Sequence, residues 1–85
     1  MTLIRSNNLP VKHAGIIFNE RILIHHNISQ TQAAKILHMS RKQIWLFANG
    51  KTSVSISLSK KLEAATGISA GFWLNIQKSY DLYMA

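Results

Sequence analysis

The side chains best suited to bind a charged partner lie in one stretch, residues 30–51. Arg41 and Lys42 follow Ser40 directly, and Lys51 closes the stretch. Arginine and lysine donate hydrogen bonds to guanine O6 and N7 and to phosphate oxygens. The chain has ten Lys and Arg against three Asp and Glu, a formal net charge of +7. Such an excess points first to nucleic acid, and next to an anionic membrane or an acidic protein.

Residues that could support catalysis or metal binding are few and scattered. The absence of cysteine excludes disulfides and thiolate metal sites. The carboxylates are those of Glu20, Glu63 and Asp81. They lie far apart in sequence, and no nucleophile stands in a motif with a base. The histidines considered as metal ligands are His25, His26 and His38, which we expect to be surface or packing residues instead. We therefore expect no enzyme, no metal site and no cofactor.

Two serines each begin a pattern that is typical of a helix start. Ser29 is followed three residues later by Gln32, and Ser40 by Gln43. In such a capping box the serine oxygen accepts from a backbone N–H of the first turn, and the amide side chain returns a hydrogen bond to the cap. The sequence therefore predicts one helix after Ser29 and a second after Ser40. The second is predicted to end at residues 49–50, because glycine readily takes the left-handed conformation that closes a helix.

The second of these helices has two different faces. At 3.6 residues per turn, its inner face carries Ile44, Phe47 and Ala48. Its outer face carries Lys42, Leu46 and Asn49, with Arg41 and Trp45 on the flank. Two capped helices joined by so short a turn must cross at a steep angle. This arrangement predicts a helix-turn-helix whose outer face is free to contact a partner.

The segments on either side are predicted to pack around this pair. Residues 1–12 contain the only proline and are interpreted as an N-terminal arm, which leaves residues 13–85 as the domain. Apolar residues recur at helical spacing from Ala14 to His26, and this helix is predicted to stop at Asn27.

Two further helices complete the prediction. The segment SVSISLS, residues 53–59, alternates polar and apolar residues as a strand does, but it has no partner strand, and the apolar residues after it continue at helical spacing. We therefore favour a helix from Ser55 to Gly67. A last helix is predicted to begin at Ser69 and to carry Phe72, Trp73, Ile76, Tyr80 and Tyr83. The predicted fold class is all-α, with five helices.

This order of caps and apolar positions resembles the Xre/Cro-like family, and more closely its HigA-type antitoxin branch. The resemblance covers roughly residues 13–82. His13, Ala14 and Gly15 stand where that branch has a His-Pro-Gly opening, Ile28-Ser29-Gln30 precedes the first motif helix, and Asn49-Gly50-Lys51 follows the second. The most specific match is C-terminal, where Phe72–Gln77 and then Tyr80, Asp81 and Leu82 are similar to Phe-Trp-Leu-Asn-Leu-Gln and Tyr-Asp-Leu.

The chain departs from the family pattern at the turn and on the recognition helix. His38 stands where the turn usually opens with glycine, so it must adopt the turn geometry with a Cβ. Ala14 replaces the proline of the first helix. Trp45 and Leu46 occupy positions where the family usually has small or polar residues, and this departure affects which DNA sequence the chain would recognise.

The resemblance implies a five-helix, lambda-repressor-like helix-turn-helix domain. It implies a cytoplasmic homodimer that binds double-stranded operator DNA, as the antitoxin of a type II HigBA-like toxin–antitoxin module that represses its own operon. Two alternatives stay open. The chain could mainly neutralise a RelE-like ribonuclease toxin, with weak or lost DNA binding, or it could be a solitary Xre-type regulator without a toxin. No apolar run is long enough for a membrane span, so no membrane partner is expected.

The residues expected to contact DNA lie in and around the two motif helices. They are Gln30, Thr31, Ser40, Arg41, Lys42, Gln43, Trp45, Leu46, Asn49 and Lys51. Arg41 and Lys42 are the candidates for base contacts. For Trp45, contact with thymine methyl groups and burial in a protein interface stay open. The residues assigned to a dimer interface, with the core as the alternative for the aromatic ones, are Trp73, Tyr80, Leu82 and Tyr83.

Overall fold

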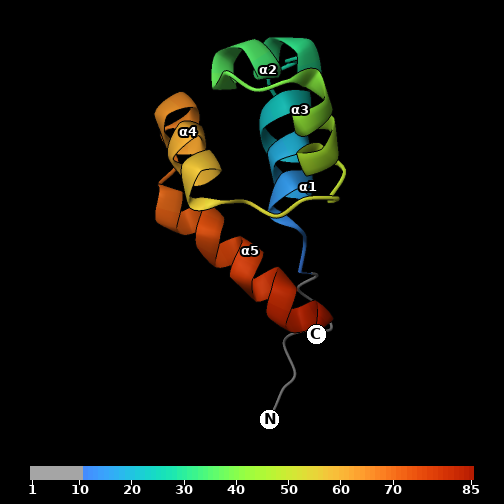
Figure 1. The fold of residues 1–85 in the computed structure, drawn as a ribbon, viewed down its shortest axis with the longest axis vertical. Helices are drawn as coiled ribbons and strands as arrows, with labels where there is room; N and C mark the ends of the chain where they lie inside the picture. Colours follow the sequence, from blue (N-terminus) through green and yellow to red (C-terminus); the bar gives the residue numbers. More distant parts are fainter. Residues whose placement is uncertain (1–10) are drawn as a thin grey trace.

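The computed structural model describes residues 11–85, and within that range its regular structure is entirely helical. The elements in chain order are α1 (Ala14–Phe18), η2 (Asn19–Ile24), α2 (Gln30–Leu37), α3 (Arg41–Ala48), α4 (Ile56–Thr66) and α5 (Ala70–Met84) (Figure 1). The prediction of an all-α fold with five α-helices is confirmed. The predicted N-terminal arm falls almost wholly on residues 1–10, outside the described residues.

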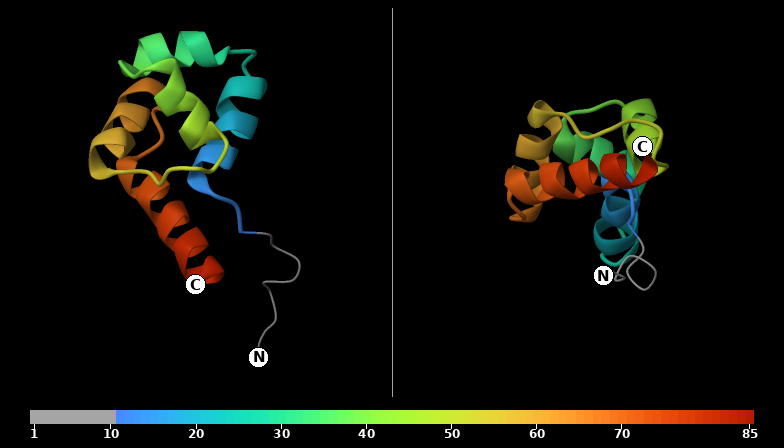
Figure 2. Two further views of the ribbon diagram at one scale, coloured as in Figure 1. Left: turned by 45° about the vertical axis from the view of Figure 1, so that its right-hand side comes forward. Right: turned by 90° about the horizontal axis from the view of Figure 1, so that it is seen from below.

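The helices close into a ring of contacts. Helix α3 packs against α1 and α2, α4 packs against α2 and α5, and α5 returns to contact α1. Helices α2 and α3 cross steeply, and the C-terminal half of α5 extends beyond the other helices (Figures 1 and 2). None of the helices in residues 11–85 has the length and hydrophobicity needed to cross a bilayer.

The centre of the core is aromatic. The Phe18 ring lies between those of Phe47 and Trp73, with ring centroids 5.6 and 6.2 Å away. Phe47 and Trp73 are fully buried, as is Leu62 of α4. Burial of each such side chain contributes about 1.5–3 kcal/mol to folding. Helices α1, α3, α4 and α5 are therefore held by one continuous apolar cluster.

The first helix differs from its prediction. We expected one α-helix from Ala14 to His26, whereas α-helical geometry ends at Phe18 and the next six residues are π-helical. Each turn of a π-helix takes up an additional residue, and the apolar spacing of the sequence does not distinguish the two geometries. Within the run Ile22-Leu23-Ile24, Leu23 is buried and Ile24 is 66% exposed. Asn27 has the predicted left-handed conformation, with φ of 57°.

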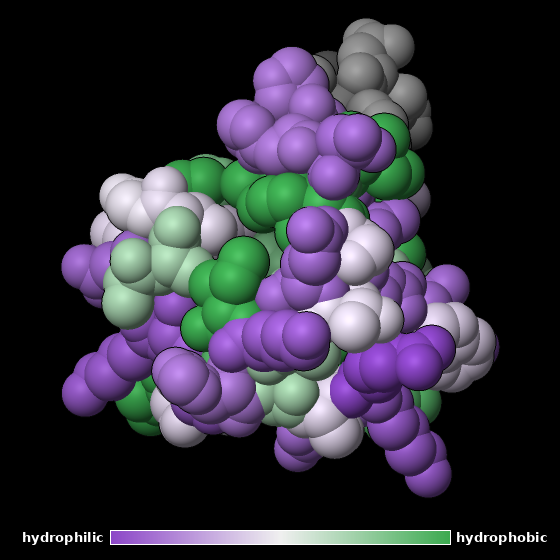
Figure 3. Space-filling view, turned by 90° about the horizontal axis from the view of Figure 1, so that it is seen from above, coloured by the Kyte–Doolittle hydropathy of each residue, from purple (hydrophilic) through white to green (hydrophobic). Residues whose placement is uncertain are grey.

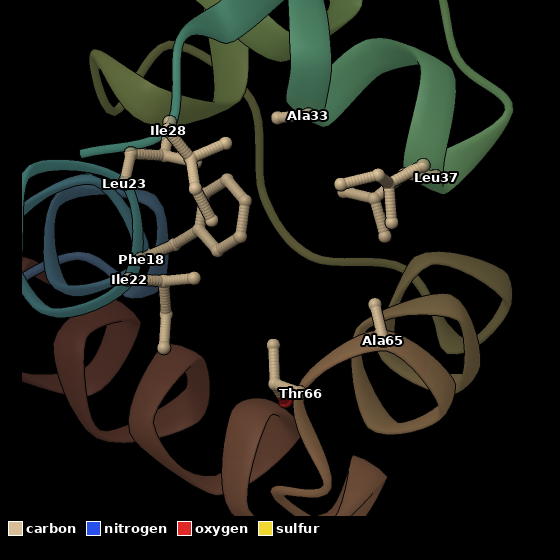
Figure 4. A pocket seen from close by; sticks show the side chains of 9 residues that line it. Phe18, Ile22, Leu23, Ile28, Ala33, Leu37, Ala65 and Thr66 are labelled. Atoms are coloured by element: carbon tan, nitrogen blue, oxygen red, sulfur yellow. The ribbon is translucent and has the colours of Figure 1, made fainter. Parts of the chain in front are cut away.

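A small hollow lies between η2, α2 and α4. Phe18, Ile22, Leu23 and Ile28 face Leu37, Ala65 and Thr66 across it (Figure 4). Its volume is about 60 Å³, far below the roughly 300–1,000 Å³ of pockets that bind drug-sized ligands. The Thr66 hydroxyl is already engaged, since it donates to the Leu62 carbonyl and accepts from the Ile68 N–H. The hollow is therefore a packing gap with an apolar lining.

Candidate nucleic-acid interface

Both predicted capping boxes are present. Ser29 Oγ accepts from the Gln32 N–H at 3.0 Å, and the Ser29 N–H donates to Gln32 Oε1 at 2.8 Å. At the start of α3, Ser40 Oγ accepts from the Gln43 N–H at 3.0 Å and the Ser40 N–H donates to Gln43 Oε1 at 2.9 Å. These bonds fix the residues at which α2 and α3 begin, and so the direction in which each points.

The turn between α2 and α3 has the expected left-handed residue. His38 has φ of 54° and ψ of 47°, and its N–H closes α2. The Met39 N–H then donates to the Ala34 carbonyl at 2.9 Å. From α4, Lys61 Nζ lies 3.5 Å from the His38 carbonyl oxygen. The prediction that histidine adopts this geometry is confirmed.

The two faces of α3 divide as predicted. Ile44, Phe47 and Ala48 are buried. Arg41, Lys42 and Gln43 are exposed at the N-terminal end of the helix, and Trp45 is 49% exposed. Leu46 is half-buried, which leaves it less surface than the sequence suggested. The first turn of α3 therefore presents two cations and an amide to the outside.

Capping limits which hydrogen bonds the α3 side chains can still make. Because Ser40 Oγ and Gln43 Oε1 accept within the capping box, the Ser40 hydroxyl hydrogen and the Gln43 NH2 group remain to donate. Asn49 donates through Nδ2 to the Trp45 carbonyl at 2.8 Å, which leaves Oδ1 as an acceptor. The start of α3 is thus a surface of donors, whose natural complements are guanine O6 and N7 or phosphate oxygens.

The residues expected to contact phosphate lie at the start of α2 and just after the end of α3. Gln30 and Thr31 form the first turn of α2, where backbone N–H groups lack intrahelical partners. Lys51 follows α3 and is exposed, after Gly50, whose φ of 73° closes the helix as predicted. Lys51 is further fixed because its N–H donates to the Leu46 carbonyl at 2.8 Å.

Gly15 brings α1 unusually close to α3. A Cβ built on Gly15 would lie 1.6 Å from the Phe47 carbonyl oxygen, well inside any allowed contact. No other residue type fits without moving one helix. In the sequence, only the family resemblance points to Gly15, because nothing local to α1 shows what its backbone touches.

His13 caps α1 and is buried. Its Nδ1 accepts from the Gly15 N–H at 2.8 Å, and its ring makes edge contacts with Phe47 and Tyr80, with centroids 6.0 and 5.2 Å apart. Desolvation by burial lowers the pKa of His13 below 6.5, against the opposite effects of the nearby Asp81 carboxylate and a hydrogen bond to the Thr52 backbone. The neutral ring is the form that can accept from Gly15.

Gln77 is a second buried polar residue that the sequence analysis did not single out. Its Oε1 accepts from the Val54 N–H at 3.3 Å, and its Nε2 donates to Asp81 Oδ1 at 3.0 Å. A signal was present in the sequence, since Gln77 lies four residues after Trp73 and four before Asp81 on one face of a helix. A glutamine on an apolar face needs a buried partner.

The expected dimer residues separate into two groups. Trp73 has no exposed surface and belongs to the core, so its side chain cannot meet a second chain and we remove it from the interface. Tyr80 is half-buried against His13. Leu82 and Tyr83 are 69% and 58% exposed near the end of α5, where they are available to a partner.

The carboxylates each have a structural partner. Glu20 pairs with Lys12 at 2.8 Å, Glu63 Oε1 accepts from the Ala70 N–H at 3.0 Å at the start of α5, and Asp81 accepts from Gln77. His25, His26 and His38 are exposed. Residues 11–85 contain no cluster of three or more His, Cys, Asp or Glu that could hold a metal ion.

Known proteins are similar to this chain in sequence and in fold. The helix-turn-helix family model matches residues 20–73 of the 85. Virulence-associated protein I of Dichelobacter nodosus is 33% identical over 79 residues, which are 93% of this chain and 73% of that protein.

Two solved structures superpose closely on the chain. The Pseudomonas aeruginosa antitoxin HigA, solved with the higBA promoter, has 26% identity and a TM-score of 0.83 over 87% of this chain and 80% of that chain. An addiction module antidote protein of the HigA family from Coxiella burnetii has 30% identity and the same TM-score over 91% of this chain and 84% of that chain. The chain therefore belongs to the helix-turn-helix family, as an Xre-like domain whose structural neighbours include HigA antitoxins.

Proposed function

We propose that the chain is a sequence-specific DNA-binding repressor of the HigA antitoxin type, which binds operator DNA of its own operon as a homodimer. The observation that carries the proposal is the capped N-terminal turn of α3, which exposes Arg41 and Lys42 on a rigid support. In the same fold, the P. aeruginosa relative was solved with its promoter. In a helix-turn-helix, this turn of the second helix enters the major groove.

Arg41 and Lys42 recognise bases in this proposal. Both can donate to guanine O6 and N7. Ser40 and Gln43 add hydroxyl and amide donors, which can reach a base acceptor or a phosphate oxygen. Because the surface offers donors, we expect guanine rather than cytosine on the strand that α3 contacts.

Gln30, Thr31 and Lys51 hold the register on the backbone. The free N–H groups at the start of α2 favour an anion, and Lys51 supplies a charge beyond the other end of the motif. Such contacts act on all DNA sequences. They are expected to account for much of the salt dependence of binding.

Trp45 and Leu46 supply apolar contacts beside these donors. With 49% of Trp45 exposed, its ring has surface for a thymine methyl group or a sugar. We therefore expect each DNA half-site to contain a G·C pair, contacted by the donors, next to an A·T pair, contacted by the apolar side chains. The alternative for Trp45 is a protein interface, which predicts lost partner binding rather than lost DNA affinity on its replacement.

The test compares Arg41→Ala, Trp45→Ala and Lys78→Ala, the last removing an exposed charge from α5 as a matched control. Affinity is measured at two salt concentrations, for a duplex from directly upstream of the coding sequence and for a scrambled duplex. Arg41→Ala is expected to cost about 1–3 kcal/mol on the specific duplex alone. Equal losses for Arg41→Ala and Lys78→Ala on both duplexes would contradict base recognition. Unchanged DNA affinity of Trp45→Ala would remove Trp45 from the interface.

Lys51 is tested by the salt dependence of binding. Lys51→Ala is expected to weaken binding to both duplexes and to reduce the slope of log K against log salt by about one unit. An unchanged slope would show that Lys51 does not face the phosphate backbone.

A second function, binding of a RelE-like ribonuclease toxin, is favoured by apolar surface outside the DNA-binding face. Ile24 of η2 is 66% exposed and Ile36 of α2 is 55% exposed. The α2 end of the molecule carries hydrophobic patches between hydrophilic side chains (Figure 3). The net charge of +7 opposes association with a basic toxin, so the contact must be mainly apolar. We propose that it uses the N-terminal segment and the first helix.

Co-purification with the product of a neighbouring gene tests this second function. Ile24→Ser is expected to weaken toxin binding and to leave DNA affinity unchanged. The matched control is Ile56→Ser, because Ile56 of α4 is also 66% exposed. A chain that purifies alone when both genes are expressed would favour the solitary regulator. If removal of residues 1–11 leaves the toxin affinity unchanged, the N-terminal segment takes no part in toxin binding.

A further inference from the structure

The loop that joins α3 to α4, residues 49–55, carries Lys51 and is held from α5. Val54 is buried in this loop, with 7% of its surface exposed. Its N–H donates to Oε1 of Gln77, whose side chain is 4% exposed. The two residues are 23 positions apart in sequence. The contact therefore ties the segment after the recognition helix to the C-terminal helix.

Asp81 determines how the Gln77 amide is oriented. An ionised carboxylate only accepts hydrogen bonds, so Asp81 Oδ1, at 3.0 Å, must face the Nε2 end of the amide. The oxygen end then faces the Val54 N–H. Without Gln77, the buried N–H of Val54 would lose its acceptor, which is costly for a buried donor.

The same loop is held on its other side by His13. A Cβ built on Gly50 would lie 3.6 Å from His13 Cγ, so the imidazole lies directly against the start of the loop that follows α3. The contacts at Gly50 and Val54 thus fall on both sides of Lys51. In Figure 1 this loop, drawn in yellow, runs from the end of α3 across to α4.

We propose that Gln77, oriented by Asp81, is a positioning residue for DNA binding, which holds residues 49–55 so that Lys51 meets the phosphate backbone. The proposal rests on the DNA-binding function proposed above. Gln77 and Asp81 do not contact the DNA. They act through the Val54 N–H on the position of the loop, and so on the one cation that it carries.

A double-mutant cycle separates this role from a general effect on folding. Gln77→Leu is expected to reduce affinity for the upstream duplex by about threefold or more, the scale of coupling between residues in one network. In a Lys51→Ala background, Gln77→Leu should cause no further loss. In a Lys42→Ala background, the loss should keep its full size, because Lys42 lies on α3 and not on the loop. Equal losses in both backgrounds would overturn the proposal.

An exchange of partners provides the rescue. The double variant Gln77→Glu with Asp81→Asn reverses only the hydrogen bond between positions 77 and 81: the carboxylate at position 77 still accepts from the Val54 N–H and now also accepts from the new amide at position 81. The net charge is unchanged, so salt dependence can be compared directly. This pair should restore affinity to within about twofold, whereas Gln77→Glu alone should not, since it sets two carboxylates against each other. A folded double variant that binds as poorly as Gln77→Leu would overturn the proposal.

Hydrogen exchange of the Val54 amide distinguishes this role from the proposed function. In the free protein, exchange should be faster in Gln77→Leu and return to the wild-type rate in the exchanged pair. Wild-type exchange in Gln77→Leu would overturn the positioning role while leaving DNA binding intact. If the wild-type protein binds the upstream duplex no more tightly than a scrambled one, the proposed function is overturned, and so is the role of Gln77 in it. This holds even if hydrogen exchange at Val54 behaves as expected.

Discussion

At the scale of single residues, Gly15 shows how one missing side chain sets the place of α3. We predict that Gly15→Ala lowers the free energy of unfolding by about 1–3 kcal/mol or more, because the new Cβ must push Phe47 and its backbone away. Alanine would otherwise favour a helix. Gly71→Ala is the control, since a Cβ there would meet only Ser69 Oγ at 3.9 Å. Denaturant unfolding measures both, and equal stability of the two variants would contradict the close α1–α3 contact.

His13 gives the fold a pH dependence. Burial lowers its pKa in the folded state below the ordinary 6.5, so between these two values the unfolded chain binds more protons. Stability is therefore full above pH 6.5 and falls as the pH decreases towards the folded-state pKa. We predict that His13→Asn, which keeps a capping oxygen, removes this part of the slope. The free energy of unfolding is measured against pH for the wild type and for His13→Asn. The same slope for both proteins between these two pH values would contradict the role of the neutral ring.

At the scale of elements, the caps decide where the recognition helix begins. Ser40→Ala removes the acceptor for the Gln43 N–H and is predicted to cost about 0.5–2 kcal/mol of stability. Ser57→Ala, at an exposed position within α4, should change stability by no more than about 0.5 kcal/mol. Thermal unfolding of both variants tests the difference. If Ser40→Ala leaves the stability unchanged, the capping box adds nothing to the placement of α3.

At the scale of the whole molecule, one α3 contacts few base pairs, and two copies one DNA turn apart, about 34 Å, would contact two half-sites. The end of α5 extends from the domain and exposes Leu82 and Tyr83, which makes it the candidate dimer interface. We predict that Leu82→Ser with Tyr83→Ser gives a protein with the 9.6 kDa mass of one chain, while the wild type has twice that mass. Light scattering at micromolar concentration, with and without DNA, measures this. A wild type of single-chain mass in both conditions would contradict the dimer.

Most of the helix ends follow from the sequence alone, because their causes are local. Ser29, Ser40, Ser55 and Ser69 each accept from an N–H three residues ahead, so spacing within one turn was enough to place them. The left-handed conformation of Gly50 followed in the same way, whereas that of His38 was expected from the family resemblance. The division of α3 into a buried and an exposed face needed only the helical period. These local rules were sufficient to expect two crossing helices with Arg41 and Lys42 outside.

Only the tertiary structure decided the contacts between residues that are far apart in the chain. Trp73 belongs to the core because the Phe18 ring packs against it, and nothing within α5 distinguishes that position from an exposed aromatic one. Gln77 reaches Val54, and Gly15 touches Phe47, across separations that no helical period encodes. The apolar pattern of residues 19–24 does not distinguish an α-helix from the π-helical turn in which Ile24 is exposed. The sequence therefore determined where most of the helices begin and which face of α3 is buried, while the packing of one helix on another determined what each buried polar group and glycine does.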